Sequence, residues 1–213
     1  MTTRVYLEVG AKRVFACAVD WPGWCRAGRT DELALAALAA YAPRYAQVAA
    51  EAGVTFRTAE FDVIERVPGS ATTDFGAPGA VPASDAEPMT ATEARRQVSL
   101  LRAAWSVFDR VAAGSPAELR KGPRGGGRDR DKMIDHVLGA EQAYARKIGI
   151  RHKQPAIGDR GAIGALRDAI SAELEKASDG AALAPNGWPA RYAVRRVTWH
   201  VLDHAWEMAD RAD

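Results

Sequence analysis

The sequence predicts an α+β protein made of two domains. Within the first 68 residues, runs rich in β-branched and aromatic residues lie at both ends, and one helical pattern lies between them. Residues 68–89 contain four prolines and three glycines without an apolar period, and four amphipathic helical patterns follow from residue 90. We therefore expect an α+β domain over residues 1–68, a linker or long exposed loop over 69–89, and a helical domain over 90–213.

The expected N-terminal domain starts with a hairpin. Residues 4–9 and 13–20 are β-rich and are separated by a short turn that begins with glycine. Thr30 is a good N-cap, and Asp31 and Glu32 place negative charge in the first helical turn. The helix that begins there is expected to end at Gly53, and residues 55–67 return to a strand pattern.

Four helices are expected after the linker. Thr90 and Glu93 form a capping-box pattern ahead of a helix that ends near Gly114. Apolar residues at helical spacing predict further helices over about 131–149, 159–178 and from Pro189 to Arg211. Four such helices in one segment most simply form a four-helix bundle.

Composition narrows the classes of partner. The 29 Lys and Arg nearly balance the 27 Asp and Glu, so no basic surface for nucleic acid is indicated. No apolar run approaches the roughly 20 residues that span a bilayer. Cys17 and Cys25 lie in a chain without a secretory leader, which argues against a disulfide framework. We expect a cytoplasmic protein that acts on a small molecule, without nucleic-acid or membrane partners. A homodimer is also expected, because the first domain is small and has exposed aromatic residues.

Three histidines are candidates for a metal site. His200 and His204 are four residues apart, so a helix would place them on one face, and His136 lies beside the apolar face of another expected helix. Neutral imidazoles bind zinc, nickel, iron or copper, and three protein ligands leave a position for water or substrate. The alternative is that these histidines are hydrogen-bonded polar residues beside a core. The fourth histidine, His152, falls in an expected loop.

Residues 90–213 resemble the DinB-like superfamily of four-helix bundles, which includes mycothiol- and bacillithiol-dependent enzymes. The resemblance rests on a histidine in the second helix ("MIDHVLGAE") and an HxxxH pair in the last ("WHVLDHAWE"). It implies that His136, His200 and His204 bind a divalent metal, with zinc or nickel expected. It also implies a low-molecular-weight thiol such as mycothiol as a cofactor, activated on the metal as thiolate.

Residues near this histidine pattern are candidates for catalysis and cofactor binding. Glu207 and Arg211 continue the stripe beyond His204 and are the expected catalytic residues, with solvated surface charges as the alternative. Glu141 and Tyr144 are further candidate helpers on the second helix. The loop "RKGPRGGGRDR" reads as a flexible lid that lacks the spacing of a phosphate-binding P-loop. Its Arg124 and Arg128 are expected to bind an anionic substrate or thiol, the alternative being a solvated interhelical loop.

The segment "DWPGWCRAGRTDELALAAL" resembles the HicB-like antitoxin domain. The matching residues are Pro22 and Gly23 in a turn, then Gly28 and Thr30 ahead of a helix. The resemblance covers about residues 3–52 and implies a β-β-β-α-β unit that serves in interaction or oligomerisation. A working antitoxin fits poorly because the chain carries no appended DNA-binding element.

Taken together, these patterns favour a metal-dependent enzyme, a thiol-dependent S-transferase or isomerase that acts on a small electrophile. Two alternatives stay open at this point. One is a non-catalytic metal-binding, stress or interaction protein in which the metal is structural. The other is an antitoxin-like regulator built on the N-terminal module.

Overall fold

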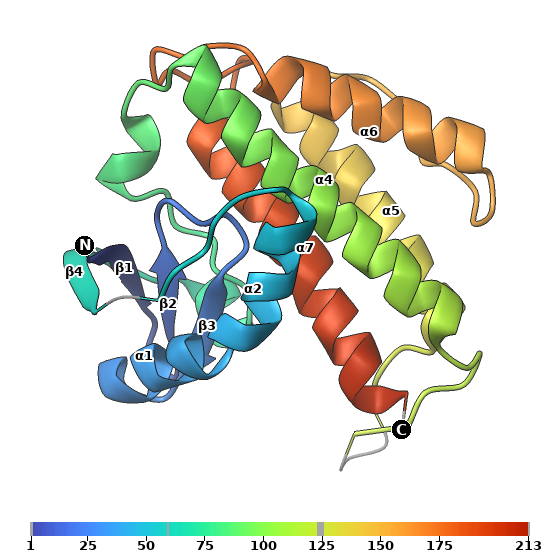
Figure 1. Cartoon of the computed structure of the whole chain (residues 1–213), viewed down its shortest axis with the longest axis horizontal. Helices are drawn as coiled ribbons and strands as arrows, with labels where there is room; N and C mark the ends of the chain where they lie inside the picture. Colours follow the sequence, from blue (N-terminus) through green and yellow to red (C-terminus); the bar gives the residue numbers. More distant parts are fainter. Residues whose placement is uncertain (1, 59, 123–125, 213) are drawn as a thin grey trace.

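The computed structural model describes residues 2–58, 60–122 and 126–212. It confirms an α+β protein, with a four-stranded sheet on one side and four long helices on the other (Figure 1). The strands are β1 (Thr3–Val9), β2 (Val14–Ala18), β3 (Cys25–Gly28) and β4 (Phe61–Pro68), in the order β3-β2-β1-β4. The helices are α1 (Asp31–Ala40), α2 (Ala42–Glu51), α3 (Ala71–Phe75), the 3-10 helix η1 (Ala83–Ala86), α4 (Ala91–Gly114), α5 (Arg130–Lys147), α6 (Arg160–Leu174) and α7 (Ala190–Arg211).

The expected hairpin is confirmed. Strands β1 and β2 pair antiparallel, with Val5 opposite Ala18 and Val9 opposite Val14. Strand β4 then pairs parallel to β1, which requires the chain to cross over, and α1 and α2 make this crossover. The order β-β-β, helix, β expected for the N-terminal part is therefore present, with two helices where one was expected.

The prediction of a single helix from residue 31 to Gly53 is wrong because the helix is interrupted. Tyr41 ends α1 as its C-cap and is also the N-cap of α2. Pro43 lies in the first turn of α2, where its missing N–H has no helical partner to lose. A proline at this position disfavours a continuous helix through the preceding turn, so the chain bends. Helix α1 then packs on β2 and β3, and α2 packs against α4.

The segment over residues 69–89 is not the exposed loop that its composition suggested. It contains α3 and η1, and Thr73, Ser84 and Asp85 are buried. The buried Glu8 carboxylate of β1 accepts hydrogen bonds from the backbone N–H groups of Gly79 and Ala80, each at 2.9 Å. A buried carboxylate without hydrogen-bond donors is costly, so these two bonds hold the segment against β1 of the sheet.

Both faces of the sheet are covered. Val5, Leu7 and Ala16 belong to the same apolar cluster as Leu38 of α1 and Tyr45 of α2. On the alternate face, Phe15 packs edge-on against Trp199 of α7, with ring centroids 6.2 Å apart. The period-2 alternation of a strand thus places the helical crossover on one side and the C-terminal helix on the other.

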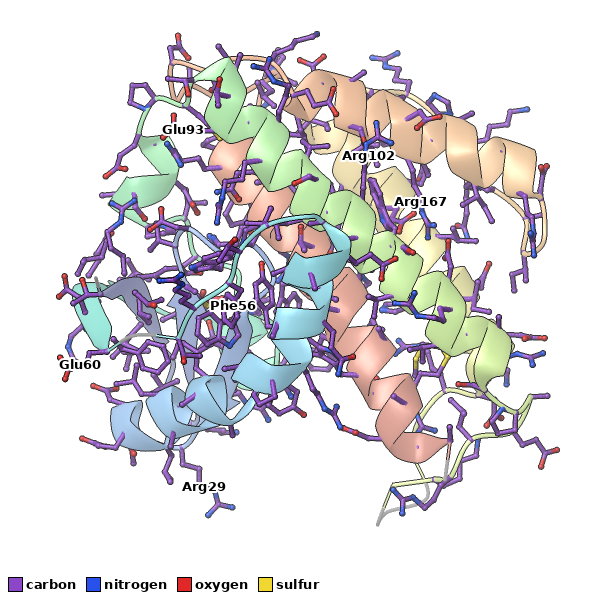
Figure 2. The ribbon with its side chains drawn as sticks, viewed as in Figure 1. Arg29, Phe56, Glu60, Glu93, Arg102 and Arg167 are labelled. Carbon is purple, nitrogen blue, oxygen red and sulfur yellow. The ribbon has the colours of Figure 1, made fainter. Side chains whose placement is uncertain are left out.

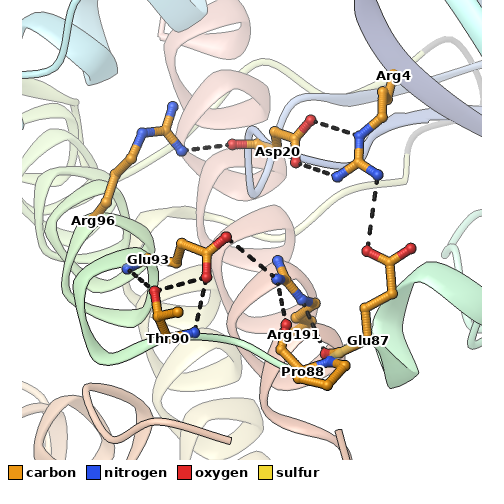
Figure 3. Close-up of polar contacts among 8 residues, drawn as sticks. All are labelled: Arg4, Asp20, Glu87, Pro88, Thr90, Glu93, Arg96 and Arg191. Atoms are coloured by element: carbon orange, nitrogen blue, oxygen red, sulfur yellow. Dashed lines mark hydrogen bonds and ion pairs between the residues drawn. The ribbon is translucent and has the colours of Figure 1, made fainter. Parts of the chain in front are cut away.

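The four long helices share a core and join the sheet through polar contacts. Buried members of this core include Leu101 and Phe108 of α4, Met133 of α5, Ile170 of α6 and Val201 of α7. Figure 3 shows the polar contacts where the parts meet: the Arg96 guanidinium of α4 donates to the Asp20 carbonyl oxygen at 2.9 Å, and Arg191 of α7 donates to that of Pro88 at 2.8 Å. Within the described residues, no helix has the length and apolar character needed to cross a membrane.

Candidate metal centre

Two neighbouring helices bring three histidines together. His200 and His204 lie one turn apart on α7, and His136 faces them from α5. The Nε2 atoms of His136 and His200 are 3.2 Å apart, and one candidate ligand atom from each of the three rings lies within 4.8 Å of the others. The three sequence-predicted ligands therefore converge on one point, and each ring lies within 5.0 Å of the other two, centroid to centroid.

The donor set fits a divalent transition metal. Zinc binds imidazole nitrogen at about 2.0–2.1 Å, so two ligands at a tetrahedral angle have nitrogens about 3.3 Å apart. The spacing between His136 Nε2 and His200 Nε2 matches this value. Three imidazoles supply three of four tetrahedral positions, which is the ligand count of catalytic rather than structural zinc sites.

Two of the three histidines, His136 and His200, are held in the neutral form that binds metal. Burial, followed by the nearby charge of Arg128 and by His204, lowers the pKa of His136 from 6.5 to about 4. Burial also lowers the pKa of His200 well below its usual value, and His204 and His136 add to the effect. Neutral imidazole with a free lone pair is the ligating species, so both groups offer that lone pair at neutral pH without first losing a proton.

Glu207 and Arg211, the expected catalytic residues, form a chain that leads away from the cluster. His204 Nδ1 lies 3.0 Å from Glu207 Oε2, and Arg211 Nη1 donates to Glu207 Oε1 at 2.8 Å. The hydrogen bond to His204 is the main reason that the pKa of Glu207 is lowered, so the carboxylate stays ionised. An ionised Glu207 favours the proton on His204 Nδ1 and leaves the Nε2 lone pair for an ion.

This contact distinguishes two roles for Glu207. A fourth protein ligand would close the coordination shell, whereas a carboxylate on the far nitrogen of a ligand histidine orients that ring. Glu207 touches Nδ1 of His204 and is held by Arg211, which is the second arrangement. Among the described residues, the Arg211 side chain donates to Glu207 and to the Arg120 carbonyl oxygen, so its link to the histidines runs through Glu207.

The loop between α4 and α5 approaches the same end of α7. Arg211 Nε donates to the Arg120 carbonyl oxygen at 2.7 Å, and the Arg120 N–H donates to the Arg211 carbonyl oxygen at 2.9 Å. Arg128 is exposed, yet its charge acts on both His136 and His200, which places it near the cluster. Arg124 lies outside the described residues, so the expected cofactor contact there stays a prediction.

Glu141 and Tyr144, the two other candidate residues on α5, lie in different surroundings. Glu141 is buried and accepts from Trp105 Nε1 at 2.8 Å and from Arg167, which Figure 2 shows among α4, α5 and α6. It therefore belongs to a buried polar network among the long helices α4, α5 and α6. Tyr144 instead packs edge-on against His200, with ring centroids 5.7 Å apart, and forms a wall of the histidine cluster.

The sequence reading missed Arg196. It lies one turn before His200 on α7, and its guanidinium sits over the rings of Trp199 and Tyr144 at 4.8 and 5.7 Å. Its charge contributes to the lowered pKa of His200. The signal was present, because residues 196, 200 and 204 are spaced by four along one helix face. His152 lies apart from the cluster, as expected, near Arg146 and Arg151.

Comparison with known proteins adds no relative: no protein family, no curated protein and no solved structure matches this chain.

Proposed function

We propose that the protein is a divalent-metal-dependent enzyme of the DinB-like class, with His136, His200 and His204 as ligands to zinc or nickel. The observation that carries the proposal is the convergence of three buried or half-buried imidazoles from α5 and α7. A DinB-like assignment draws support from the order of these ligands, one in the second long helix and two in the fourth. The N-terminal sheet would be the HicB-like part.

The residues around the histidine cluster would have separate roles in the reaction. Bound metal would supply a Lewis acid that lowers the pKa of a coordinated thiol or water, and in this class the thiol would be mycothiol or a related low-molecular-weight compound. Glu207 would keep His204 in its ligating tautomer, and Arg211 would hold Glu207 in place. Tyr144 and Trp199, both near His200, would exclude water from that side. The reaction we favour is an S-transfer or isomerisation of a small electrophile.

A metal assay tests the first step. The protein is purified without an affinity tag or nickel column and dialysed against trace zinc or nickel. Its metal content per chain is then measured by inductively coupled plasma mass spectrometry. We expect about one ion per chain in the wild type and almost none in the His136→Ala/His204→Ala double variant. His152→Ala is the matched control, because this histidine lies outside the cluster, and should bind as the wild type does. Equal metal in all three proteins, or none in the wild type, contradicts the proposal.

A spectroscopic assay tests whether the site takes a thiol. The wild-type protein is loaded with cobalt(II) and titrated with a low-molecular-weight thiol such as cysteinyl-glucosamine. Direct coordination produces a sulfur-to-cobalt charge-transfer band in the ultraviolet, which the S-methylated compound must not produce. No band with the free thiol would contradict thiol activation and favour the alternative of a non-catalytic metal-binding protein.

A further inference from the structure

A cavity lies beside the metal centre, between the N-terminal sheet and the last turns of α7. Its volume is about 420 Å³, which is within the range of about 300–1,000 Å³ for small-molecule sites. The sheet side supplies Arg13, Phe15, Cys25, Arg26 and Ala27, the helical side Asp203, Glu207, Asp210 and Arg211, and Tyr41 and Gly76 complete the wall. The cavity therefore needs both the N-terminal sheet and helix α7.

Glu207 connects the cavity to the histidines. One of its carboxylate oxygens contacts His204 Nδ1, the other accepts from Arg211, and both residues line the cavity. A molecule in the cavity would therefore lie on the Nδ1 side of His204, with Glu207 between it and the imidazole ring.

The charges of the cavity are paired, with one exception. Asp203 pairs with Arg26 at 3.0 Å, Glu207 with Arg211 at 2.8 Å, and Asp210 with Arg44. The remaining cation of the lining, the half-buried Arg13, makes no ion pair with any residue that the structure describes.

Arg13 lies against the backbone of Gly76. A Cβ atom at Gly76 would lie 3.1 Å from Arg13 Nη1, and this glycine has a φ of +127°. The absence of a side chain there leaves room for the guanidinium at the wall of the cavity. A guanidinium in this setting offers parallel N–H donors to a carboxylate.

We propose that this cavity binds a small monocarboxylate, with Arg13 as the receptor for the carboxylate and Phe15 and Tyr41 against the apolar part. A monoanion is favoured over a phosphate dianion, because Arg13 is the one lining cation without an ion pair among the described residues and balances a single negative charge. Binding of a carboxylate in this cavity does not depend on a metal at the histidine cluster, because none of the three histidines lines the cavity.

The probe is phenylacetate, measured by isothermal titration calorimetry on the full chain with metal removed by a chelator. Phenylacetamide, nearly the same shape but neutral, is compared on the wild type, and phenyl phosphate serves as the dianion. We expect phenylacetate to bind with at least about tenfold higher affinity than either compound, since a charge-assisted hydrogen bond to Arg13 is lost with the amide. Absence of saturable phenylacetate binding, or equal or tighter binding of the amide or the phosphate, overturns the proposal.

Variants locate the site. Arg13→Gln should weaken phenylacetate binding at least about tenfold. Arg29→Gln is the matched control: Arg29 is exposed near the start of α1, outside the cavity, and should leave binding unchanged (Figure 2). Equal affinity of the Arg13→Gln and Arg29→Gln proteins overturns the proposal. The His136→Ala/His200→Ala protein separates the two questions: it loses two of the three proposed metal ligands but keeps the His204–Glu207 contact at the cavity, so it should bind phenylacetate as the wild type does.

Discussion

The Asp85–Arg195 pair ties the segment over residues 69–89 to the rest of the molecule. Asp85 of η1 and Arg195 of α7 are 4% and 3% exposed, and the carboxylate is bonded to the guanidinium through two nitrogens. The same guanidinium contacts the Tyr6 hydroxyl of β1 and donates to the Ala80 carbonyl oxygen at 3.3 Å. One buried cation thus joins the sheet, the segment and α7, and Asp85→Ala removes its counter-charge.

The structure sets the size of the expected loss. Removing one partner of a buried ion pair costs about 3–5 kcal/mol, because the other charge stays buried without compensation. Tyr6 and Ala80 still accept from Arg195 in the variant, which favours the lower end of the range. For a chain of this size, about 3 kcal/mol corresponds to a Tm lower by about 6–12 °C.

Urea unfolding at pH 7, monitored by circular dichroism, measures this loss in the free energy of unfolding. The matched control is Asp168→Ala, which removes the partner of Arg102 from a pair whose aspartate side chain is 74% exposed, and it should cost no more than about 1 kcal/mol. The double variant Asp85→Ala/Arg195→Met should recover part of the lost stability, since it no longer buries a charge. If Asp85→Ala costs as little as Asp168→Ala, the segment does not depend on this pair and the reasoning is refuted.

Two further predictions concern the histidine cluster. The pKa of His136 is about 4 in the folded protein and 6.5 ordinarily, so between these values the unfolded chain binds more protons. The metal-free protein should therefore lose stability as the pH falls from 6.5 to 4, seen as a lower urea midpoint at pH 5 than at pH 7. His136→Ala should show a smaller decrease, and an equal decrease in both proteins would contradict the assignment. Glu207→Gln should weaken metal binding about 10–100-fold, because the bond that orients His204 is weakened. Competition with a chromophoric chelator measures this affinity, with the exposed Glu118→Gln as control; equal affinities would show that Glu207 does not act through His204.

Local signals in the sequence were reliable where the interaction spans few residues. The Thr90 hydroxyl accepts from the Glu93 N–H, and the Glu93 carboxylate accepts from the Thr90 N–H at 2.8 Å, as a capping box requires. Thr30 likewise caps α1 by accepting from the Leu33 N–H. Both contacts bridge three residues, so the sequence contains both partners within one turn.

Long-range contacts explain where the sequence reading failed. The proline- and glycine-rich composition of residues 69–89 is typical of exposed loops. The segment is instead held by Glu8, which is separated from Gly79 by 71 positions in the chain. No pattern within the segment reveals that a carboxylate from β1 will bind its N–H groups.

The sequence by itself determined the α+β class, the hairpin, the starts of α1 and α4 and the helical spacing of His200 and His204, because these follow from residue type and from periods of two or 3.6 residues. Only the tertiary structure decided that His136 Nε2 meets His200 Nε2 at 3.2 Å. It also decided that Glu207 faces Nδ1 of His204 and that Arg13 shares a cavity with Glu207. These distances depend on how α5, α7 and the sheet pack, and packing sums many weak contacts that no local pattern encodes.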